Sequence, residues 1–210
     1  MKTESYEDQV KSWPKHGRHI LAQFDQETLI VYQAYNPTIG TFAARHGYFG
    51  GDFSFNRMSW IKPNFLWMMF RSGWGTKPGQ EVTLAVRLRR DAFDSILAQA
   101  VHSTFVPEVY SIHQRWKEQL AHSPIRLQWD PDHDPQGVKQ DRRAIQLGLS
   151  GEVLKKYARE WVVEIEDISD FVASQREHAQ KADRHLVTPR EEIYPVTDEA
   201  VFKRLQLSEA

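Results

Sequence analysis

The chain contains no cysteine among its 210 residues. This absence excludes disulfides, thiolate metal sites, iron–sulfur clusters and a cysteine nucleophile, and it favours a reducing compartment. Long apolar runs are also absent, since the longest, Phe65 to Phe70, is far shorter than the roughly 20 residues of a membrane-spanning helix. The start, Met1 to Glu7, lacks the apolar stretch of a secretory signal. We therefore expect a cytoplasmic protein with no membrane partner.

The sequence also has almost no net charge, −1 at pH 7. Without an overall field, an anionic partner must be held by a local group of cations. Familiar catalytic motifs are missing too, because there is no Gly-x-Ser-x-Gly element and the nine histidines follow no zinc-enzyme spacing. Asp130, Asp132 and Asp134 alternate like cation ligands, but the glycine and glutamate of a calcium loop are absent and the prolines beside them favour a plain loop. We expect no metal cofactor.

What the sequence does contain is the composition of one folded domain, with 40% hydrophobic and 26% charged residues. A chain of this length can bury about two-thirds of its unfolded surface in one core. Strand-like and helix-like periodicities are mixed along it, which predicts a single α+β domain with a mixed or antiparallel, split sheet and about four to five helices. The predicted limits are a polar N-terminal tail over 1–17, the α+β domain over 18–171, and a helix plus extended tail wrapping that domain over 172–210.

Several of the predicted elements have clear end signals. Asn36-Pro37 and Gly47 predict a helix over 37–46, and Pro63 and Gly73 delimit an apolar helix that we expect to be buried on every side. Strict alternation over 82–89 predicts a strand with one exposed face. The remaining predicted elements are strands at 20–24, 29–35, 125–129, 144–149 and 161–165, and helices from Asp91, over 108–120 and over 151–159.

The segment from Phe53 to Gln80 is the predicted site, because it has no acidic residue but combines cations with indole rings. Cations suit phosphates and flat rings suit a base, so the segment predicts a pocket for a nucleotide-like small molecule or for nucleic acid. An equally weighted alternative places the rings in the core and the cations on the surface. Arg71 favours the pocket, since a guanidinium at the end of a buried helix needs an anionic partner. The residues are Arg57, Lys62, Arg71 and Lys77 with Trp60, Trp67 and Trp74.

Two further patterns bear on this site. The glycine-rich stretch from Ser72 to Gly79 carries Lys77 but follows a helix and lacks the P-loop pattern, so a structural turn is favoured over a mobile lid. Gln33 and Gln146 interrupt apolar strand runs, which predicts that they line a cleft. The alternative is that each faces solvent.

These motifs resemble a known family. The stretches that carry the resemblance are Val31 to Tyr35, Arg57-Met58-Ser59-Trp60-Ile61-Lys62-Pro63, Phe65 to Met69, Arg71-Ser72-Gly73-Trp74, Gln128-Trp129-Asp130 and Arg143 to Gly148. They resemble the domain-of-unknown-function family 4291 over about Arg18 to Tyr194. The resemblance implies no established activity.

A weaker resemblance is to the ADP-ribosyltransferase fold, in the order of a polar strand residue, a short helix ending at glycine, and a later polar strand residue. It implies NAD as the cofactor and transfer to a nucleobase or nucleic acid, because Gln146 replaces the usual Glu. A non-catalytic binder of a nucleotide or a nucleic-acid end is the alternative. The catalytic candidates are Gln33, Gln146 and Arg71, and the nucleotide-binding candidates are Tyr32, Tyr35, Arg57, Trp60, Lys62, Trp74 and Lys77.

Overall fold

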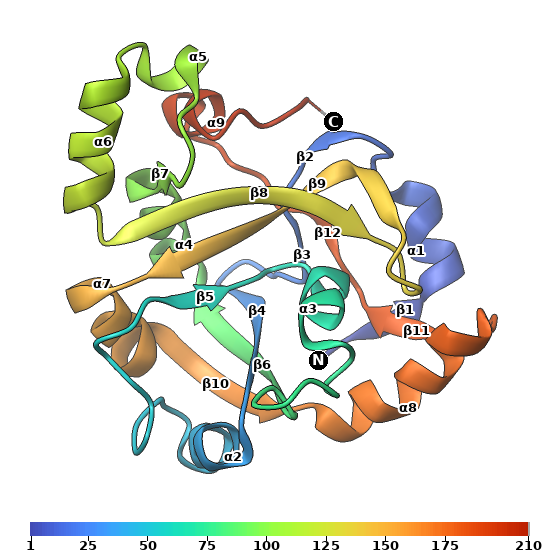
Figure 1. Ribbon diagram of the computed structural model, residues 1–210. Coiled ribbons are helices and arrows are strands. Elements are labelled where there is room, and N and C mark those ends of the chain that lie inside the picture. The colour runs from blue at the N-terminus through green and yellow to red at the C-terminus, as the bar shows by residue number, and fades with distance from the viewer. Residues whose placement is uncertain (210) are drawn as a thin grey trace.

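The computed structural model describes residues 1–209 and folds them into one α+β domain (Figure 1). Two main sheets form it, a three-stranded sheet in the order β10-β6-β4 and a five-stranded mixed sheet in which β2-β9-β8-β7 are neighbours and β5 pairs with β9. An isolated bridge between Tyr32 and Lys62 links the two sheets. The predicted α+β domain with a mixed, split sheet is confirmed. The strands are β4 (Thr28–Tyr35), β6 (Val82–Arg89) and β10 (Val162–Asp167), and β2 (Gly17–Arg18), β5 (Ser59–Ile61), β7 (Val101–His102), β8 (Ile125–His133) and β9 (Lys139–Leu149).

Residues 1–209 contain nine α-helices, more than the predicted number because several are only one or two turns long. The predicted helix over 108–120 is wrong as one unit, since the chain breaks at Ser111, whose φ is 56°. No helix in the described part of the chain has the length and apolar character needed to cross a membrane. The helices are α1 (Tyr6–Ser12), α2 (Pro37–His46), α3 (Phe65–Ser72), α4 (Arg90–Gln99), α5 (Pro107–Tyr110), α6 (His113–His122), α7 (Gly151–Lys156), α8 (Ser169–Lys181) and α9 (Glu199–Arg204), with a π-helix at Tyr157–Trp161.

The ends of α2 and α3 follow from local chemistry. The Asn36 side chain accepts a hydrogen bond from the first turn of α2, and Gly47 ends that helix with a φ of 73°, so the predicted limits are confirmed. Asn64 caps α3 in the same way, which places its start after Pro63. Phe70 and Arg71, in the last turn, are exposed, so the prediction that α3 is buried on every side is wrong there.

Strand β6 is buried on both faces over Val82–Val86, which corrects the expectation of an exposed face there, whereas Arg87 is partly exposed and Arg89 exposed, as predicted. Leu84 and Val86 pack in the larger core, whereas Ala85 packs in a second core that includes Tyr32 and Phe65. This follows from position, because β6 is the central strand between β4 and β10 and α3 packs across β4. Alternation therefore identified the strand but not its surroundings.

The end of β8 differs from the predicted loop. The strand continues through Pro131 to His133, with a register shift between these two residues. Asp132 is only 1% exposed and forms an ion pair with Arg142 of β9, which is 4% exposed. This buried pair joins β8 to β9, so Asp130 and Asp132 lie on the strand, whereas Asp134 lies in the loop that follows it, as predicted.

The first 17 residues form β1 (Thr3–Ser5) and α1 rather than the loose tail that their polarity predicts, and Gln9 and Trp13 are buried. Strand β1 pairs with β11 (Val187–Pro189), and β3 (Leu21–Ala22) pairs with β12 (Glu192–Ile193). Segments from both ends of the chain thus lie side by side against the main sheets (Figure 1).

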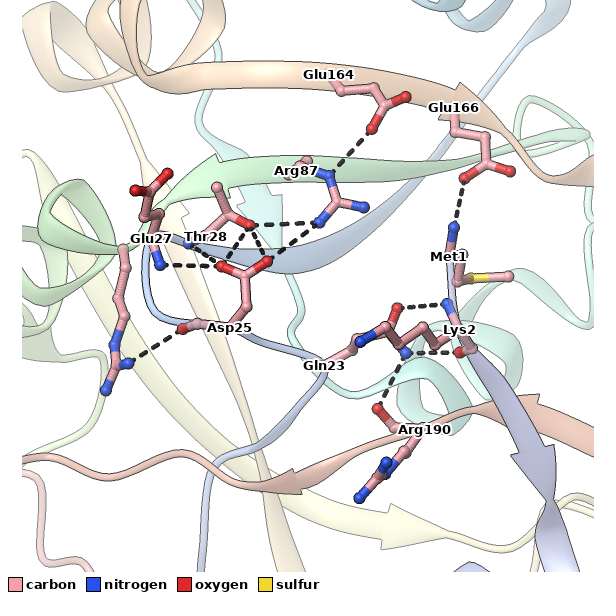
Figure 2. Close-up of polar contacts among 11 residues, drawn as sticks. Met1, Lys2, Gln23, Asp25, Glu27, Thr28, Arg87, Glu164, Glu166 and Arg190 are labelled. Carbon is pink, nitrogen blue, oxygen red and sulfur yellow. Dashed lines mark hydrogen bonds and ion pairs between the residues drawn. The ribbon is translucent and has the colours of Figure 1, made fainter.

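Ion pairs and hydrogen bonds join these terminal segments to the outer face of the three-stranded sheet (Figure 2). The Met1 ammonium lies 3.4 Å from the Glu166 carboxylate on β10, and the Lys2 amide donates to the Gln23 side chain at 2.9 Å. Arg87 on β6 donates to Glu164 on β10 at 3.0 Å. On this face, the Met1 ammonium and the Arg87 guanidinium thus have carboxylate partners within the chain.

Candidate functional site

A cavity of about 450 Å³ lies where β4, β5 and α3 meet, beside the bridge that links the two sheets. Eleven of its 17 lining residues lie between Phe53 and Gln80, in the segment singled out from the sequence. Six of the ten predicted site residues line it, namely Gln33, Tyr35, Arg57, Trp60, Lys62 and Arg71. The structure therefore brings together candidates from β4 and from the cation-rich segment.

Lys62 is the most unusual residue of this cavity. Its side chain lines the cavity although the residue is only 6% exposed. Within residues 1–209, its ammonium forms no ion pair, and no hydrogen bond contributes to the shift of its pKa. The pKa of Lys62 is lowered to about 8, mainly by burial and then by the Arg71 guanidinium, while Asp130 partly opposes both. The cavity thus contains an ammonium that forms no ion pair with any residue of 1–209, although Asp130 acts on its charge from a longer distance.

Arg57 and Arg71 lie at the exposed rim of the same cavity. Arg71 is exposed, so the inference that it is a buried guanidinium needing an internal partner is wrong. Neither arginine has an ion pair among the described residues. One acid, Asp52, is among the lining residues, and it is exposed. The lining therefore has three cations against one carboxylate.

Gln33 is 2% exposed, and its amide is fully engaged by its neighbours. Its Nε2 donates to Tyr35 Oη and to Ser59 Oγ, both at 2.8 Å, and its Oε1 accepts from Tyr157 Oη at 2.7 Å. Tyr35 and Ser59 contact each other at 2.6 Å. Gln33 thus orients the hydroxyls of Tyr35 and Ser59 at the cavity wall instead of offering a free amide to a ligand.

Trp60 lies on β5 opposite Gly148 of β9, and its ring is partly exposed in the cavity wall. A Cβ on Gly148 would lie 3.0 Å from the Trp60 ring and 2.5 Å from Met58 Sδ. Gly148 is therefore required for Trp60 and Met58 to pack over β9, which fixes the indole at the cavity.

Gln146 does not line the cavity, contrary to the prediction. Its Nε2 donates to Asp130 Oδ2 at 2.7 Å, and Gln128 donates to Asp130 Oδ1 at 2.8 Å. The two glutamines face each other across β8 and β9 and hold the Asp130 carboxylate between them. Gln146 thus contacts the carboxylate that partly opposes the lowering of the Lys62 pKa, but it does not itself reach the cavity.

Three more predicted residues lie outside the lining of this cavity. The Tyr32 ring is 0% exposed and packs edge-on against Phe65, with ring centroids 5.4 Å apart. The Trp74 indole N–H donates to Pro135 O at 3.2 Å. Lys77 Nζ donates to Arg71 O at 2.6 Å and so caps the last turn of α3. The glycine-rich stretch from Ser72 to Gly79 forms turns, as predicted, and its last residue, Gly79, lines the cavity.

Helix α3, which supplies Met68 and Arg71 to the cavity, begins against a buried carboxylate. Glu191 accepts hydrogen bonds from the Phe65 amide at 2.6 Å and from Asn64 Nδ2 at 3.1 Å. Burial raises the pKa of Glu191 well above its usual value, and the bond from the Phe65 amide opposes this. A residue of the C-terminal segment thus anchors the start of the helix.

A family model described as Domain of unknown function (DUF4291) matches residues 19–194. The chain belongs to this family. No match was found among the curated proteins. The similarity to the ADP-ribosyltransferase fold has no support in these comparisons.

In this DUF4291 chain, sequence reasoning missed the residues that support the cavity from other elements. Ser59 lies inside the predicted segment and inside a stretch that carries the family resemblance, but no role was predicted for it because serine is common. Tyr157 opens the π-helix, far along the chain from Gln33, and no local signal connects them. Asp130 was considered as a cation ligand or, preferably, as a loop residue, and its contacts were missed because its two glutamine partners meet only when β8 and β9 pair.

Proposed function

We propose that the cavity binds the phosphate-bearing part of a nucleotide-like ligand, with Lys62 as its main anion contact. The observation that supports this is Lys62, which lines the cavity at 6% exposure and whose ammonium forms no ion pair within the described residues. A charge held this way costs free energy unless a partner compensates it. An anionic ligand supplies that partner, and Arg57 and Arg71 at the rim add two further donors for phosphate oxygens.

The rest of the cavity suits the remainder of such a ligand. Its volume of about 450 Å³ falls within the range of small-molecule sites. The partly exposed indole of Trp60 offers a flat apolar face for a base. The Tyr35 and Ser59 hydroxyls, oriented by Gln33, offer donors and acceptors for ribose hydroxyls.

Binding without turnover is the form of this proposal that the side chains favour. A transferase of the ADP-ribosyl type would use Gln33 and Gln146 on NAD, but the first amide is engaged by Tyr35, Ser59 and Tyr157, and the second by Asp130. NAD therefore enters the proposal as one ligand among nucleotides and nucleic-acid ends. Its consumption would identify an enzyme.

Thermal melting against NAD⁺, ADP-ribose, ATP, GTP and short oligonucleotides tests the proposal. A ligand at a hundred times its dissociation constant stabilises the protein by about 2.7 kcal/mol. We expect such a shift with at least one ligand for the wild type and for Lys117→Met, an exposed control lysine on α6, but none for Lys62→Met. If no ligand shifts the wild type, or if Lys62→Met keeps the shift, the proposal is wrong.

A further inference from the structure

A second group of polar side chains lies where α8 ends, and none of its members lines the cavity described above. His178 is in the last turn of α8, and Asp183 and His185 follow in the turn that leads to β11. The Asp183 carboxylate lies 3.2 Å from His178 Nδ1 through Oδ2 and 2.6 Å from His185 Nδ1 through Oδ1. One donor atom from each residue lies within 4.8 Å of the other two.

The backbone holds these three side chains together. Ala182 ends α8 in the left-handed region with a φ of 48°, which turns the chain back on the helix. The Asp183 amide then donates to His178 O at 3.0 Å, and the His185 amide donates to Asp183 Oδ1 at 2.9 Å. The Leu186 amide donates to Asp183 O at 3.0 Å, which closes the turn. Hydrogen bonds from three main-chain amides thus hold the three side chains close together.

We propose that His178, Asp183 and His185 bind one divalent cation of the late first-row metals, zinc foremost. Two imidazole nitrogens and one carboxylate oxygen are the donor set that such metals prefer, whereas magnesium and calcium favour oxygen donors. Three protein ligands leave the fourth tetrahedral position to water. This proposal is independent of the cavity and concerns a metal site that no motif in the sequence indicates.

The distances suit this assignment. Ligand atoms about 2.1 Å from a tetrahedral zinc ion lie about 3.4 Å from each other. The separation of 3.2 Å between His178 and Asp183 already agrees. The contact of 2.6 Å between His185 and Asp183 has to open by less than about 1 Å. The His185 side chain is 64% exposed and so has room for this movement.

A bound cation would fasten the end of α8 to the segment that enters β11. This turn contains two exposed basic residues, Lys181 and Arg184, where trypsin cleaves. Because a cleavable segment must unfold locally to enter a protease, cross-linking the turn through a metal slows cleavage at both positions. The site therefore has a readout that does not depend on any activity.

Zinc titration of the chelator-treated full chain by calorimetry, with cobalt absorption as a second probe, tests the proposal. We expect one equivalent of zinc to bind, and a visible cobalt spectrum typical of tetrahedral geometry. His178→Ala and His185→Ala should each weaken binding by about tenfold or more, since each removes a ligand. The matched control is His122→Ala, an exposed histidine at the end of α6 whose Nδ1 lies 2.7 Å from Glu118 O.

Trypsin digestion of the same proteins completes the test. Zinc should slow cleavage at Lys181 and Arg184 in the wild type and in His122→Ala, but not in His178→Ala or His185→Ala. Wild-type protein that binds no zinc overturns the proposal. So does zinc binding that both ligand variants retain at wild-type affinity.

Discussion

Lys62 and Arg142 are both buried cations, 6% and 4% exposed, but the chain treats them differently. Arg142 forms an ion pair with Asp132, donates to Pro14 O at 3.0 Å, and lies 5.1 Å from the centre of the Trp13 ring. Lys62 has no ion-pair partner within the described chain. A cation that serves the fold has its counter-ion built in. Lys62, which lies in a cavity wall without an ion pair in the described chain, fits the anion site that we propose.

Breaking the built-in pair should have the largest effect on stability. Asp132→Asn keeps the volume of the side chain but leaves the Arg142 charge buried without its carboxylate, so we expect a loss of about 3–5 kcal/mol in the free energy of unfolding. Urea unfolding at neutral pH measures it. A loss below about 1 kcal/mol would mean that the Pro14 carbonyl is enough for Arg142, and the contrast with Lys62 would fail.

At the cavity, we expect a substitution of the buried cation to raise the free energy of unfolding instead of lowering it. Lys62→Met removes a buried charge that has no partner, so the free protein should gain about 1–3 kcal/mol at neutral pH. Lys117→Met, on an exposed face of α6, should stay within about 0.5 kcal/mol of the wild type. If Lys62→Met is destabilised instead, the ammonium has a compensating partner in the free protein.

The pH dependence of stability gives a second test of the Lys62 charge. The pKa of Lys62 is lowered to about 8 in the folded chain, whereas an unfolded lysine titrates near 10.4. Between these values the unfolded chain holds a proton that the folded chain has released, so stability rises with pH. The advantage of Lys62→Met should therefore shrink, by up to about 3 kcal/mol, as pH rises through this window. A constant difference between the two proteins from about pH 7 to about pH 10 would contradict the lowered pKa.

The two arginines at the rim should affect ligand binding more than stability. Each substitution, Arg57→Ala or Arg71→Ala, should weaken binding of an anionic nucleotide about tenfold and change stability by less than about 0.5 kcal/mol. Only Arg71→Ala should also raise the pH above which binding weakens, because Arg71 lowers the pKa of Lys62. Equal pH profiles for the two variants would show that Arg71 does not act on Lys62.

Local signals predicted the elements whose ends depend on nearby residues. Asn36 and Gly47 fixed α2 because a cap and a left-handed glycine act within one turn. The surroundings of β6 and the continuation of β8 through Pro131 were missed, since both depend on strands that pair from far along the chain. The burial of Trp13 was missed for the same reason, because its partner is the Glu191 carbonyl.

The site residues also divide into those that nearby sequence could predict and those that depend on distant strand pairing. Arg57, Trp60 and Lys62 were predicted because they lie close together in the chain. Tyr32 was wrongly included beside Gln33, although successive residues of a strand face opposite sides and Tyr32 lies in the second core. That rule could have excluded Tyr32 from the sequence alone. The contacts of Gln146 with Asp130 could not have been predicted, since they require the register of β8 and β9.

The carboxylate of Glu191 at the start of α3 also bears on how the protein matures during synthesis. The hydrogen bond from the Phe65 amide to this carboxylate spans 126 residues of sequence. A chain emerging from the ribosome displays the apolar α3 segment long before the group that anchors it exists. The nascent cavity wall therefore stays unfinished until the C-terminal segment has emerged, so the cavity is completed late in folding.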